Sequence, residues 1–306
     1  MTTPVETANW TVGKLLAWTT DYFSRHEMDE PRLSAELLLA HALGCSRMAL
    51  YTGYEQTPPA AQVEMFRSLV KRRKDHEPVA YLTGKAWFYS MELCVSSDVL
   101  IPRPDTETLV EQAITALRNG SSPQPRVLDL CTGSGCAALA IAKNCPTAQI
   151  VATDISNAAM AVAQTNALHV GLSDRVVFRH GDLFGALPPD DAPFDLITAN
   201  PPYISTGLID ALAPEISRHE PRLALDGGDD GLQIIRRIIE RAPEHLAAGG
   251  WLMMETAFDQ TQQVSELIMR TGRFESPRVI LDAARNPRCV VAQFIGSSTA
   301  PHAQGA

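Results

Sequence analysis

Apolar residues in the first quarter of the chain recur every three or four positions, which is the spacing of an amphipathic helix. The pattern covers residues 12–19, 33–41 and 63–70. The second of these stretches stops at Gly44, and glycine commonly follows the last residue of a helix. No strand-like alternation of apolar and polar residues interrupts the pattern. We therefore predict a small helical domain over residues 1–78.

The pattern changes after Pro78. Residues 79–100 are rich in β-forming residues, and Gly84 and Ser96-Ser97 break them into short runs. Short β-forming runs separated by turn residues are typical of a hairpin. We predict a β-hairpin linker over residues 79–100 and a helix in the segment that follows it.

From residue 126 onward, short apolar runs alternate with helical patterns. The expected strands cover residues 126–131, 149–153, 175–179, 194–199, 251–255 and 289–294. Strands that alternate with helices form a parallel, doubly wound sheet, which binds ligands at the carboxyl ends of its strands. The predicted α/β domain spans residues 101–296, and residues 297–306 have the composition of a disordered tail.

Composition and charge narrow the possible functions. The chain has 306 residues, of which 45% are hydrophobic and 20% charged, so we expect a globular protein of two unequal domains. Its formal net charge of −9 argues against direct DNA binding, because phosphate neutralisation usually requires a basic face. The basic run at residues 71–74 lies in a helical stretch, and we interpret it as a solvated helix face.

Cysteine usage and hydropathy favour a cytoplasmic protein. The six cysteines form no CxxC pair and no cluster with histidine, so we expect reduced thiols and no metal site. Residues 1–10 have no signal-peptide pattern, and no apolar stretch is long enough to predict a membrane span.

A strand that runs into a glycine-bearing turn predicts a cofactor site. The segment reads Val127-Leu128-Asp129-Leu130-Cys131-Thr132-Gly133-Ser134-Gly135. Glycine permits a tight turn and lets a ligand approach the backbone closely. Asp154 ends the next strand, where an acidic side chain can hydrogen-bond ribose hydroxyls. Cofactor contacts are expected at Asp129, Cys131, Thr132, Gly133, Ser134, Gly135 and Asp154, and also at Asn200 farther along the chain.

These features fit both a nicotinamide cofactor, for which Ala138 could provide the third small residue, and S-adenosylmethionine. Asp129 favours S-adenosylmethionine, because a carboxylate before the turn suits a cationic ligand better than a pyrophosphate. Asp182 follows the third strand and is expected to bracket the adenine, with Leu183 and Phe184 providing apolar surface. Each acid alone could be a loop carboxylate or a helix cap, but three acids at successive strand ends favour a cofactor site.

Asn200-Pro201-Pro202-Tyr203 follows the fourth expected strand and predicts the reaction centre. Two prolines stiffen the backbone and remove two donors, so carbonyl oxygens and the Asn200 side chain remain. An NH2 group could donate one hydrogen to the Asn200 side-chain carbonyl and one to the Pro201 carbonyl. That geometry would aim the nitrogen lone pair at a methyl group while Tyr203 stacks on the planar substrate. A plain Asn-Pro turn is the alternative, but the position after a strand favours catalysis.

Further motifs lie on both sides of this tetrapeptide. They are Ala35-Glu36-Leu37-Leu38-Leu39-Ala40-His41, Glu77-Pro78-Val79-Ala80-Tyr81-Leu82-Thr83-Gly84, Ile101-Pro102-Arg103-Pro104-Asp105-Thr106-Glu107, His219-Glu220-Pro221-Arg222-Leu223-Ala224-Leu225 and Gly227-Gly228-Asp229-Asp230-Gly231. With them the chain resembles the PrmC/HemK family of peptide-chain release factor N5-glutamine methyltransferases. The resemblance implies a Rossmann-like, seven-stranded class I methyltransferase sheet whose last strand is antiparallel, and S-adenosyl-L-methionine as cofactor. It also implies that the helical domain docks class 1 release factors, whose Gly-Gly-Gln loop inserts its glutamine into the pocket.

The chain departs from this family at Cys131 and Ala257, where glycine is usual, and at Asn286-Pro287-Arg288. Cys131 and the segment at residues 81–88 also resemble enzymes that methylate a glutamine of a large-subunit ribosomal protein, which is an alternative substrate. The sequence leaves three more functions open: an amino-methyltransferase acting on DNA or RNA bases, a non-catalytic cofactor-binding scaffold and a nicotinamide dehydrogenase. The acidic charge balance argues against a nucleic-acid methyltransferase, and the intact tetrapeptide argues against a non-catalytic scaffold. The lack of a proton-relay residue argues against a dehydrogenase.

Overall fold

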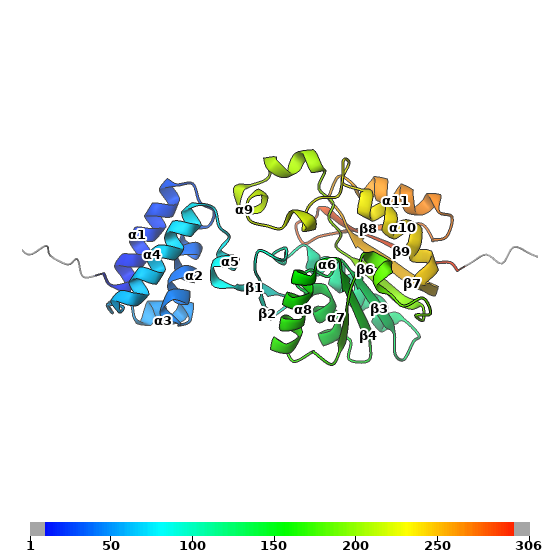
Figure 1. Ribbon diagram of the computed structural model, residues 1–306, viewed down its shortest axis with the longest axis horizontal. Helices are drawn as coiled ribbons and strands as arrows, with labels where there is room; N and C mark the ends of the chain where they lie inside the picture. The colour runs from blue at the N-terminus through cyan, green and yellow to red at the C-terminus, as the bar shows by residue number, and fades with distance from the viewer. Residues whose placement is uncertain (1–9, 297–306) are drawn as a thin grey trace, which may run out of the picture. The chain divides into compact units, whose positions relative to one another are not determined.

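The computed structural model describes residues 10–296, which form two compact units (Figure 1). Of the described residues, the helical unit contains residues 10–85 together with the segment Pro214–His219, and the α/β unit contains Ala86–Ala213 and residues 220–296. The expected tail at 297–306 lies outside the described residues. Among the residues that are described, no helix has the length and apolar character needed to cross a membrane.

The helical unit has one apolar core, formed by the positions that repeat at helical spacing. Its helices are α1 (Val12–Arg25), α2 (Pro31–Leu43), α3 (Arg47–Thr52), α4 (Ala60–Lys74), α5 (Val79–Thr83) and α9 (Pro214–Ser217). Thr11 caps α1 by accepting a hydrogen bond from the Lys14 amide, and Gly44 ends α2 in the left-handed conformation at φ 64°. The predicted helical domain is therefore present.

Two expectations about this region need correction. Residues 79–83 form α5 and not a strand, because Pro78 and the left-handed Gly84 bound one helical turn whose Leu82 enters the apolar core. The hairpin is confined to β1 (Lys85–Phe88) and β2 (Met91–Cys94). The basic run at the end of α4 is also not wholly solvated, since Arg73 is 4% exposed and pairs with Glu215 at 3.0 Å.

The α/β unit is built on a seven-stranded sheet of order β5-β4-β3-β6-β7-β9-β8. Its strands are β3 (Arg126–Leu130), β4 (Gln149–Asp154), β5 (Val176–His180), β6 (Phe194–Ala199), β7 (Leu246–Glu255), β8 (Arg278–Leu281) and β9 (Pro287–Gln293). The strands from β3 to β7 pair in parallel, and β9 is antiparallel to both β7 and β8. The seven strands and the antiparallel last strand agree with the family resemblance, whereas the periodicity alone did not reveal β8.

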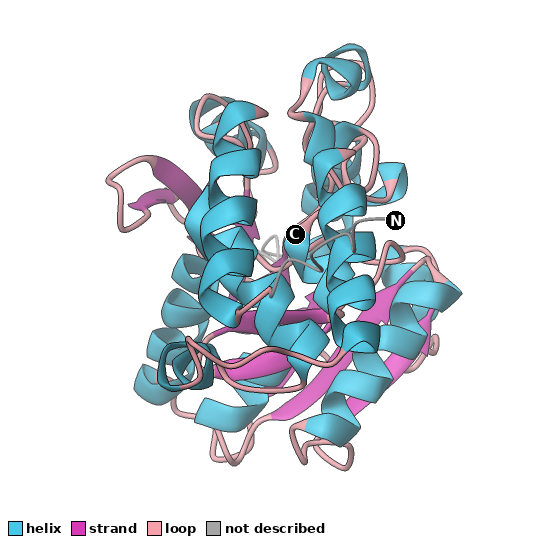
Figure 2. Cartoon of the chain, turned by 90° about the vertical axis from the view of Figure 1, so that its left-hand side faces the viewer, coloured by secondary structure: helices cyan, strands magenta, loops and turns pink. Residues whose placement is uncertain are grey.

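Helices pack on both faces of this sheet (Figures 1 and 2). They are α6 (Thr106–Asn119), α7 (Cys136–Asn144), α8 (Asn157–His169), α10 (Gln233–His245) and α11 (Thr261–Arg270), with short 3-10 turns at Leu183–Ala186, Thr206–Ala211 and Arg222–Ala224. One apolar cluster joins the sheet to α6 and α7, and a second joins it to α10 and α11. The carboxyl ends of β3, β4 and β6, which are neighbours in the parallel part of the sheet, therefore meet at one edge.

Candidate active site

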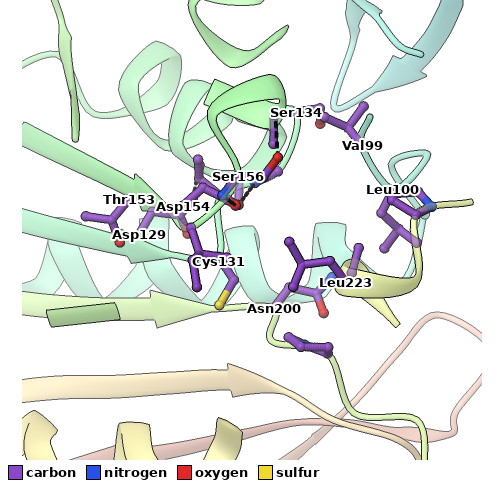
Figure 3. A pocket seen from close by; sticks show the side chains of 18 of the residues that line it. Val99, Leu100, Asp129, Cys131, Ser134, Thr153, Asp154, Ser156, Asn200 and Leu223 are labelled. Carbon is purple, nitrogen blue, oxygen red and sulfur yellow. Dashed lines mark hydrogen bonds between the residues drawn. The ribbon is translucent and has the colours of Figure 1, made fainter. Parts of the chain in front are cut away.

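A cavity of about 190 Å³ opens at the carboxyl ends of β3, β4 and β6. All the residues that line it belong to the α/β unit. Of the residues predicted to form the site, Asp129, Cys131, Thr132, Gly133, Ser134, Asp154, Asp182, Leu183, Asn200 and Pro202 line this cavity. In Figure 3, Asp129, Cys131 and Asp154 lie on one side and Asn200 and Leu223 on the other. The fold thus brings the two predicted parts of the site together.

The glycine turn after β3 is shaped by residues with positive φ. Cys131, Gly133 and Gly135 have φ values of 56°, 55° and 80°. Gly135, which caps α7, does not line the cavity but packs tightly against α8, since a Cβ there would lie 3.2 Å from the Cβ of Ala163. Cys131 is the exception, because a residue with a side chain is held in a region that favours glycine.

The Asp154 side chain connects the glycine turn after β3 to the start of α8. Its Oδ2 accepts a hydrogen bond from the Gly133 amide at 2.9 Å, and its Oδ1 accepts one from the Ser156 amide, also at 2.9 Å. The carboxylate therefore fixes the glycine turn and the start of α8 while it lines the cavity. Each of its oxygens keeps a further lone pair for a ligand hydroxyl.

Asp129 is buried at 2% exposure, and both of its oxygens are engaged. The Thr132 hydroxyl donates to Oδ2 at 2.6 Å, and the Thr198 hydroxyl donates to Oδ1 at 2.8 Å. Burial raises the pKa of Asp129 to about 6, against the effect of these two hydrogen bonds. Asp129 thus supports the turn as well as lining the cavity, and Thr198 is a partner that no sequence pattern indicated.

Asp182 lines the cavity together with a cationic partner. Its Oδ2 accepts a hydrogen bond from Arg237 of α10 at 2.6 Å, and both side chains line the cavity. Leu183 follows in the left-handed conformation at φ 49° and is buried. Arg237 was not predicted, because nothing in the local pattern of α10 separates it from the other arginines of that helix.

Asn200 follows β6 with its side-chain amide directed at α6. Its Nδ2 donates a hydrogen bond to Oγ1 of Thr106 at 3.1 Å. Pro202 lines the cavity, whereas Pro201 and Tyr203 do not. The Tyr203 ring packs against the apolar cluster beside α10, and its hydroxyl donates to Glu255 at 3.3 Å. Stacking of Tyr203 on a substrate therefore stays a prediction, which this position of the ring does not support.

The glycine-rich motif at residues 227–231 holds the backbone of the tetrapeptide. A Cβ at Gly227 would lie 2.7 Å from the Pro202 carbonyl oxygen, and one at Gly231 would lie 2.3 Å from that of Tyr203. Ile204 and Asp226 form a parallel β-bridge alongside. Because only glycine permits this close approach of two backbone segments, local packing explains why the motif has glycine at these two positions.

Two further motifs, together with the residues just before the first of them, form the apolar rim of the cavity. Arg103 donates a hydrogen bond to Glu220, which is 6% exposed, and this ion pair joins residues 98–106 to residues 220–226. The rim side chains are Val99, Leu100, Pro102, Pro221, Leu223 and Ala224. Leu223 is 56% exposed and lies near Asn200 in Figure 3. Both motifs were identified from the sequence, but their role as walls beside Asn200 was not.

Comparisons with known proteins agree with this arrangement. The PrmC N-terminal domain family matches residues 14–84, and a methyltransferase domain family matches residues 127–219. The release factor glutamine methyltransferase of Rhodopirellula baltica is 43% identical over 94% of this chain and 99% of its own length. The enzyme of the same name from Geobacter sulfurreducens is 43% identical over 86% of this chain and 90% of its own.

Solved structures support the fold of the α/β unit. The delta-N METTL16 methyltransferase domain matches with a TM-score of 0.53 at 18% identity, covering 68% of this chain and 90% of that one. At this identity the match concerns the fold alone, and it confirms a methyltransferase-like sheet. The near full-length relatives lead to one conclusion: this chain belongs to the release factor glutamine methyltransferase family.

Proposed function

We propose that this protein transfers a methyl group from S-adenosyl-L-methionine to the side-chain amide nitrogen of the glutamine in the Gly-Gly-Gln motif of class 1 peptide-chain release factors. The observation that carries the proposal is the orientation of Asn200. Its Nδ2 is occupied by Thr106, so Oδ1 is the atom left to accept a hydrogen bond from a substrate in the cavity. The relatives that bear the activity in their names match this chain over most of its length.

The residues of the cavity fit S-adenosylmethionine. Asp129, Asp154 and Asp182 place three carboxylates around it, and Arg237 pairs with one of them. The remaining acidic surplus suits a ligand that carries a sulfonium and an ammonium group. Asp154 would accept hydrogen bonds from the ribose hydroxyls, and Leu183 would provide an apolar surface for the adenine, since both line the cavity. When bound, S-adenosylmethionine supplies an electrophilic methyl group.

Asn200 and the Pro201 carbonyl would orient the substrate amide. The nitrogen of a planar amide is a poor nucleophile because its lone pair is delocalised. If the Asn200 Oδ1 and the Pro201 carbonyl oxygen each accept one N–H, both hydrogens are held out of the preferred plane and the lone pair is localised. The apolar rim, including Leu100 and Leu223, would exclude water from the amide. After transfer, the nitrogen has become acidic, and water can take its extra proton.

The helical unit is proposed to dock the release factor. It contains the segment that matches the PrmC N-terminal domain, at residues 14–84, and it contributes no residue to the cavity lining. We therefore propose that the helical unit binds the release factor and that the α/β unit carries out the reaction. The helical unit then takes no part in methyl transfer itself.

Mass spectrometry tests the proposed function directly. Purified release factor would be incubated with the enzyme and S-adenosylmethionine, in parallel with large ribosomal subunits and with DNA and RNA. We expect a gain of one methyl group on the Gly-Gly-Gln peptide of the release factor. Methylation of a ribosomal-protein glutamine, or of a nucleic-acid base, without modification of the release factor would reject the proposed substrate.

The variant Asn200→Ala tests the proposed role of Asn200 in methyl transfer. We expect methyl transfer at saturating cofactor to fall about a hundred- to a thousandfold, because a preorganised acceptor that matters mostly in the transition state is lost. Cofactor affinity in calorimetry should stay close to that of the parent. Transfer within a few-fold of the parent rate would show that Asn200 does not orient the substrate.

A further inference from the structure

A second cavity, of about 350 Å³, lies in the helical unit, and no described residue of the α/β unit lines it. Helices α1 and α4, which lie side by side in Figure 1, provide its walls together with Trp10, which precedes α1. We call this cavity the α1–α4 groove. It shares no residue with the cavity at the carboxyl ends of β3, β4 and β6, so the methyl transfer proposed above makes no use of it.

The floor of the groove is apolar and firmly packed. Leu15, Phe66 and Val70 line it, and all three are buried in the apolar core of the helical unit. Because the core holds these side chains, the floor is formed before a partner arrives, which lowers the entropic cost of binding. Preformed apolar concavities of this kind are typical of binding sites.

One wall carries aromatic side chains that the core does not require. The Trp18 ring stacks on Tyr22, with centroids 5.0 Å apart and 10° between the ring planes, and it meets Trp10 edge-on at 6.3 Å. Trp18 is nevertheless 49% exposed and lies outside the apolar core. Tryptophan and tyrosine are enriched in protein interfaces, where they often dominate the binding free energy. The row of aromatic rings is therefore a surface that a protein partner can bury.

The charges of the groove are of one sign. Arg67 and Lys71 both line it, are exposed and lie four residues apart on α4. Arg67 has one long ion pair, with Glu64 at 3.5 Å, and both side chains of that pair are more than half exposed, so it holds the guanidinium only weakly. No acidic residue of the described chain lines the groove. In a chain with a net charge of −9, this local positive charge favours an acidic partner.

We propose that the α1–α4 groove binds an acidic, amphipathic segment of the protein substrate. Apolar side chains of that segment would rest on the floor and against Trp18, and its carboxylates would face Arg67 and Lys71. An amphipathic helix laid in an apolar groove is one of the common modes of peptide recognition. The inference rests on the proposed function, because it takes the methylated protein as the partner and names the surface that docks it.

Single-stranded nucleic acid is also bound by aromatic rings and cations, but this groove suits it less well. Tyr22 already covers one face of the Trp18 ring, so a base could stack on the other face alone. Two cations one helical turn apart cannot follow an extended phosphate backbone, which requires a basic track. The buried apolar floor provides no contact for phosphate and suits aliphatic or aromatic side chains instead.

Two substitutions test the groove, and each has a matched control. Trp18→Ala removes the exposed ring and leaves the apolar core intact, whereas Trp87→Ala removes a tryptophan of β1 that is 70% exposed and lines neither cavity. Lys71→Glu reverses a charge in the groove, and Lys74→Glu reverses an exposed charge of the same helix outside it. Thermal unfolding midpoints close to that of the parent would show that all four variants are folded.

Methyl transfer to intact release factor and to a short Gly-Gly-Gln peptide separates docking from chemistry. Trp18→Ala should lower kcat/KM on intact release factor at least about tenfold, mainly through KM, as expected for a central aromatic contact. Lys71→Glu should lower it about five- to tenfold at low salt, and the loss should shrink at about 1 M salt, where exposed charges are screened. Rates on the short peptide should stay within about twofold of the parent, as should both controls on either substrate.

Calorimetric titration with release factor gives a measurement that needs no methyl transfer. Trp18→Ala and Lys71→Glu should bind it more weakly than their controls do, while a single-stranded RNA oligonucleotide should not compete. Parent-like affinity in both groove variants, or displacement of release factor by the oligonucleotide, would overturn the inference. If the parent methylates release factor and the groove variants bind it normally, this inference alone fails. If the parent binds release factor through the groove without methylating it, the proposed function alone fails.

Discussion

At the scale of single residues, Asp154 holds the glycine turn and also lines the cavity that we propose binds the cofactor. Its carboxylate accepts from the amides of Gly133 and Ser156 and also lines the cavity. We expect Asp154→Ala to weaken S-adenosylmethionine binding about ten- to a hundredfold, because charged hydrogen bonds contribute roughly 1.5–3 kcal/mol. Asp154→Asn, which keeps one acceptor, should lose less. Calorimetry measures both, and unchanged affinity in the alanine variant would remove Asp154 from the cofactor site.

Cys131 offers a second test, of backbone strain. The residue has φ 56°, in the left-handed region that favours glycine. A side chain held in this left-handed region lowers the free energy of unfolding by about 1 kcal/mol. Glycine avoids this strain, but part of the gain is lost because glycine gives the unfolded chain more conformational freedom. We therefore expect Cys131→Gly to unfold at a higher temperature than Cys131→Ala, since both lack the sulfur and differ in the Cβ. A glycine variant no more stable than the alanine variant would show that the turn is not strained.

The individual site residues differ in how far sequence could identify them. The glycine turn, Asp154 and Asn200 were predictable because each directly follows an apolar run that is typical of a strand. Thr198 and Glu255 were not, because buried polar residues inside a strand have no local signature. Their roles depend on which strands become neighbours, and only the sheet order β3-β6-β7 places them beside the turn and the tetrapeptide.

At the scale of elements, periodicity predicted the long helices and the central strands, whose patterns extend over several turns or are bounded by clear turn residues. It failed for α5, a single helical turn composed of β-forming residues. There the burial of Leu82 in the helical core outweighs intrinsic preference. β8 was missed because it is a short strand at the edge of the sheet: its apolar run is only three residues long, and its residues are mostly exposed.

Helices α2 and α3 are joined by a buried carboxylate that gives a pH-dependent prediction. Glu36 is 2% exposed and accepts from Arg32 and Arg47, each at 2.6 Å, and from Tyr51. Burial raises the pKa of Glu36, but the hydrogen bonds from Tyr51, Arg47 and Arg32 outweigh it and lower the pKa to about 2. Because the folded-state pKa is depressed, this stabilisation is present above about pH 4.5 and is lost as the pH falls toward 2.

We accordingly expect Glu36→Gln to lower the free energy of unfolding of the helical unit at pH 7 by about 2–3 kcal/mol, allowing for solvent screening of the half-exposed arginines. The difference from the parent should shrink steadily between about pH 4.5 and pH 2. Hydrogen exchange of the α2 amides, corrected for intrinsic rates, measures it. Glu64→Gln, which breaks an exposed pair in α4, is the control and should have little effect at any pH. If Glu36→Gln lowered the free energy of unfolding equally at pH 7 and pH 2, the lowered pKa of Glu36 would be contradicted.

At the scale of the whole molecule, the two-domain organisation was predictable, but the segment Pro214–His219 was not. This segment follows the tetrapeptide in sequence yet belongs to the helical unit, where Glu215 pairs with the buried Arg73 and His219 contacts the Asp75 carbonyl at 3.2 Å. Such a crossing depends on a pairing between residues far apart in the chain, and no local pattern indicates it. The chain therefore passes between the units more than once, and it does so shortly after the tetrapeptide at residues 200–203.

The helical unit should select the protein substrate without taking part in methyl transfer. The chemistry-bearing residues all follow residue 97, and the cavity lining contains no residue of the helical unit. A chain beginning at Ala86 should bind S-adenosylmethionine with the parent affinity, which calorimetry can check and which also reports that the α/β unit is folded. Its rate on a short Gly-Gly-Gln peptide should stay within about twofold of the parent. Its kcat/KM on intact release factor should fall at least about tenfold, since losing a docking surface removes more than about 1.4 kcal/mol of binding free energy. Parent-like kcat/KM on intact release factor would show that recognition resides in the α/β unit instead.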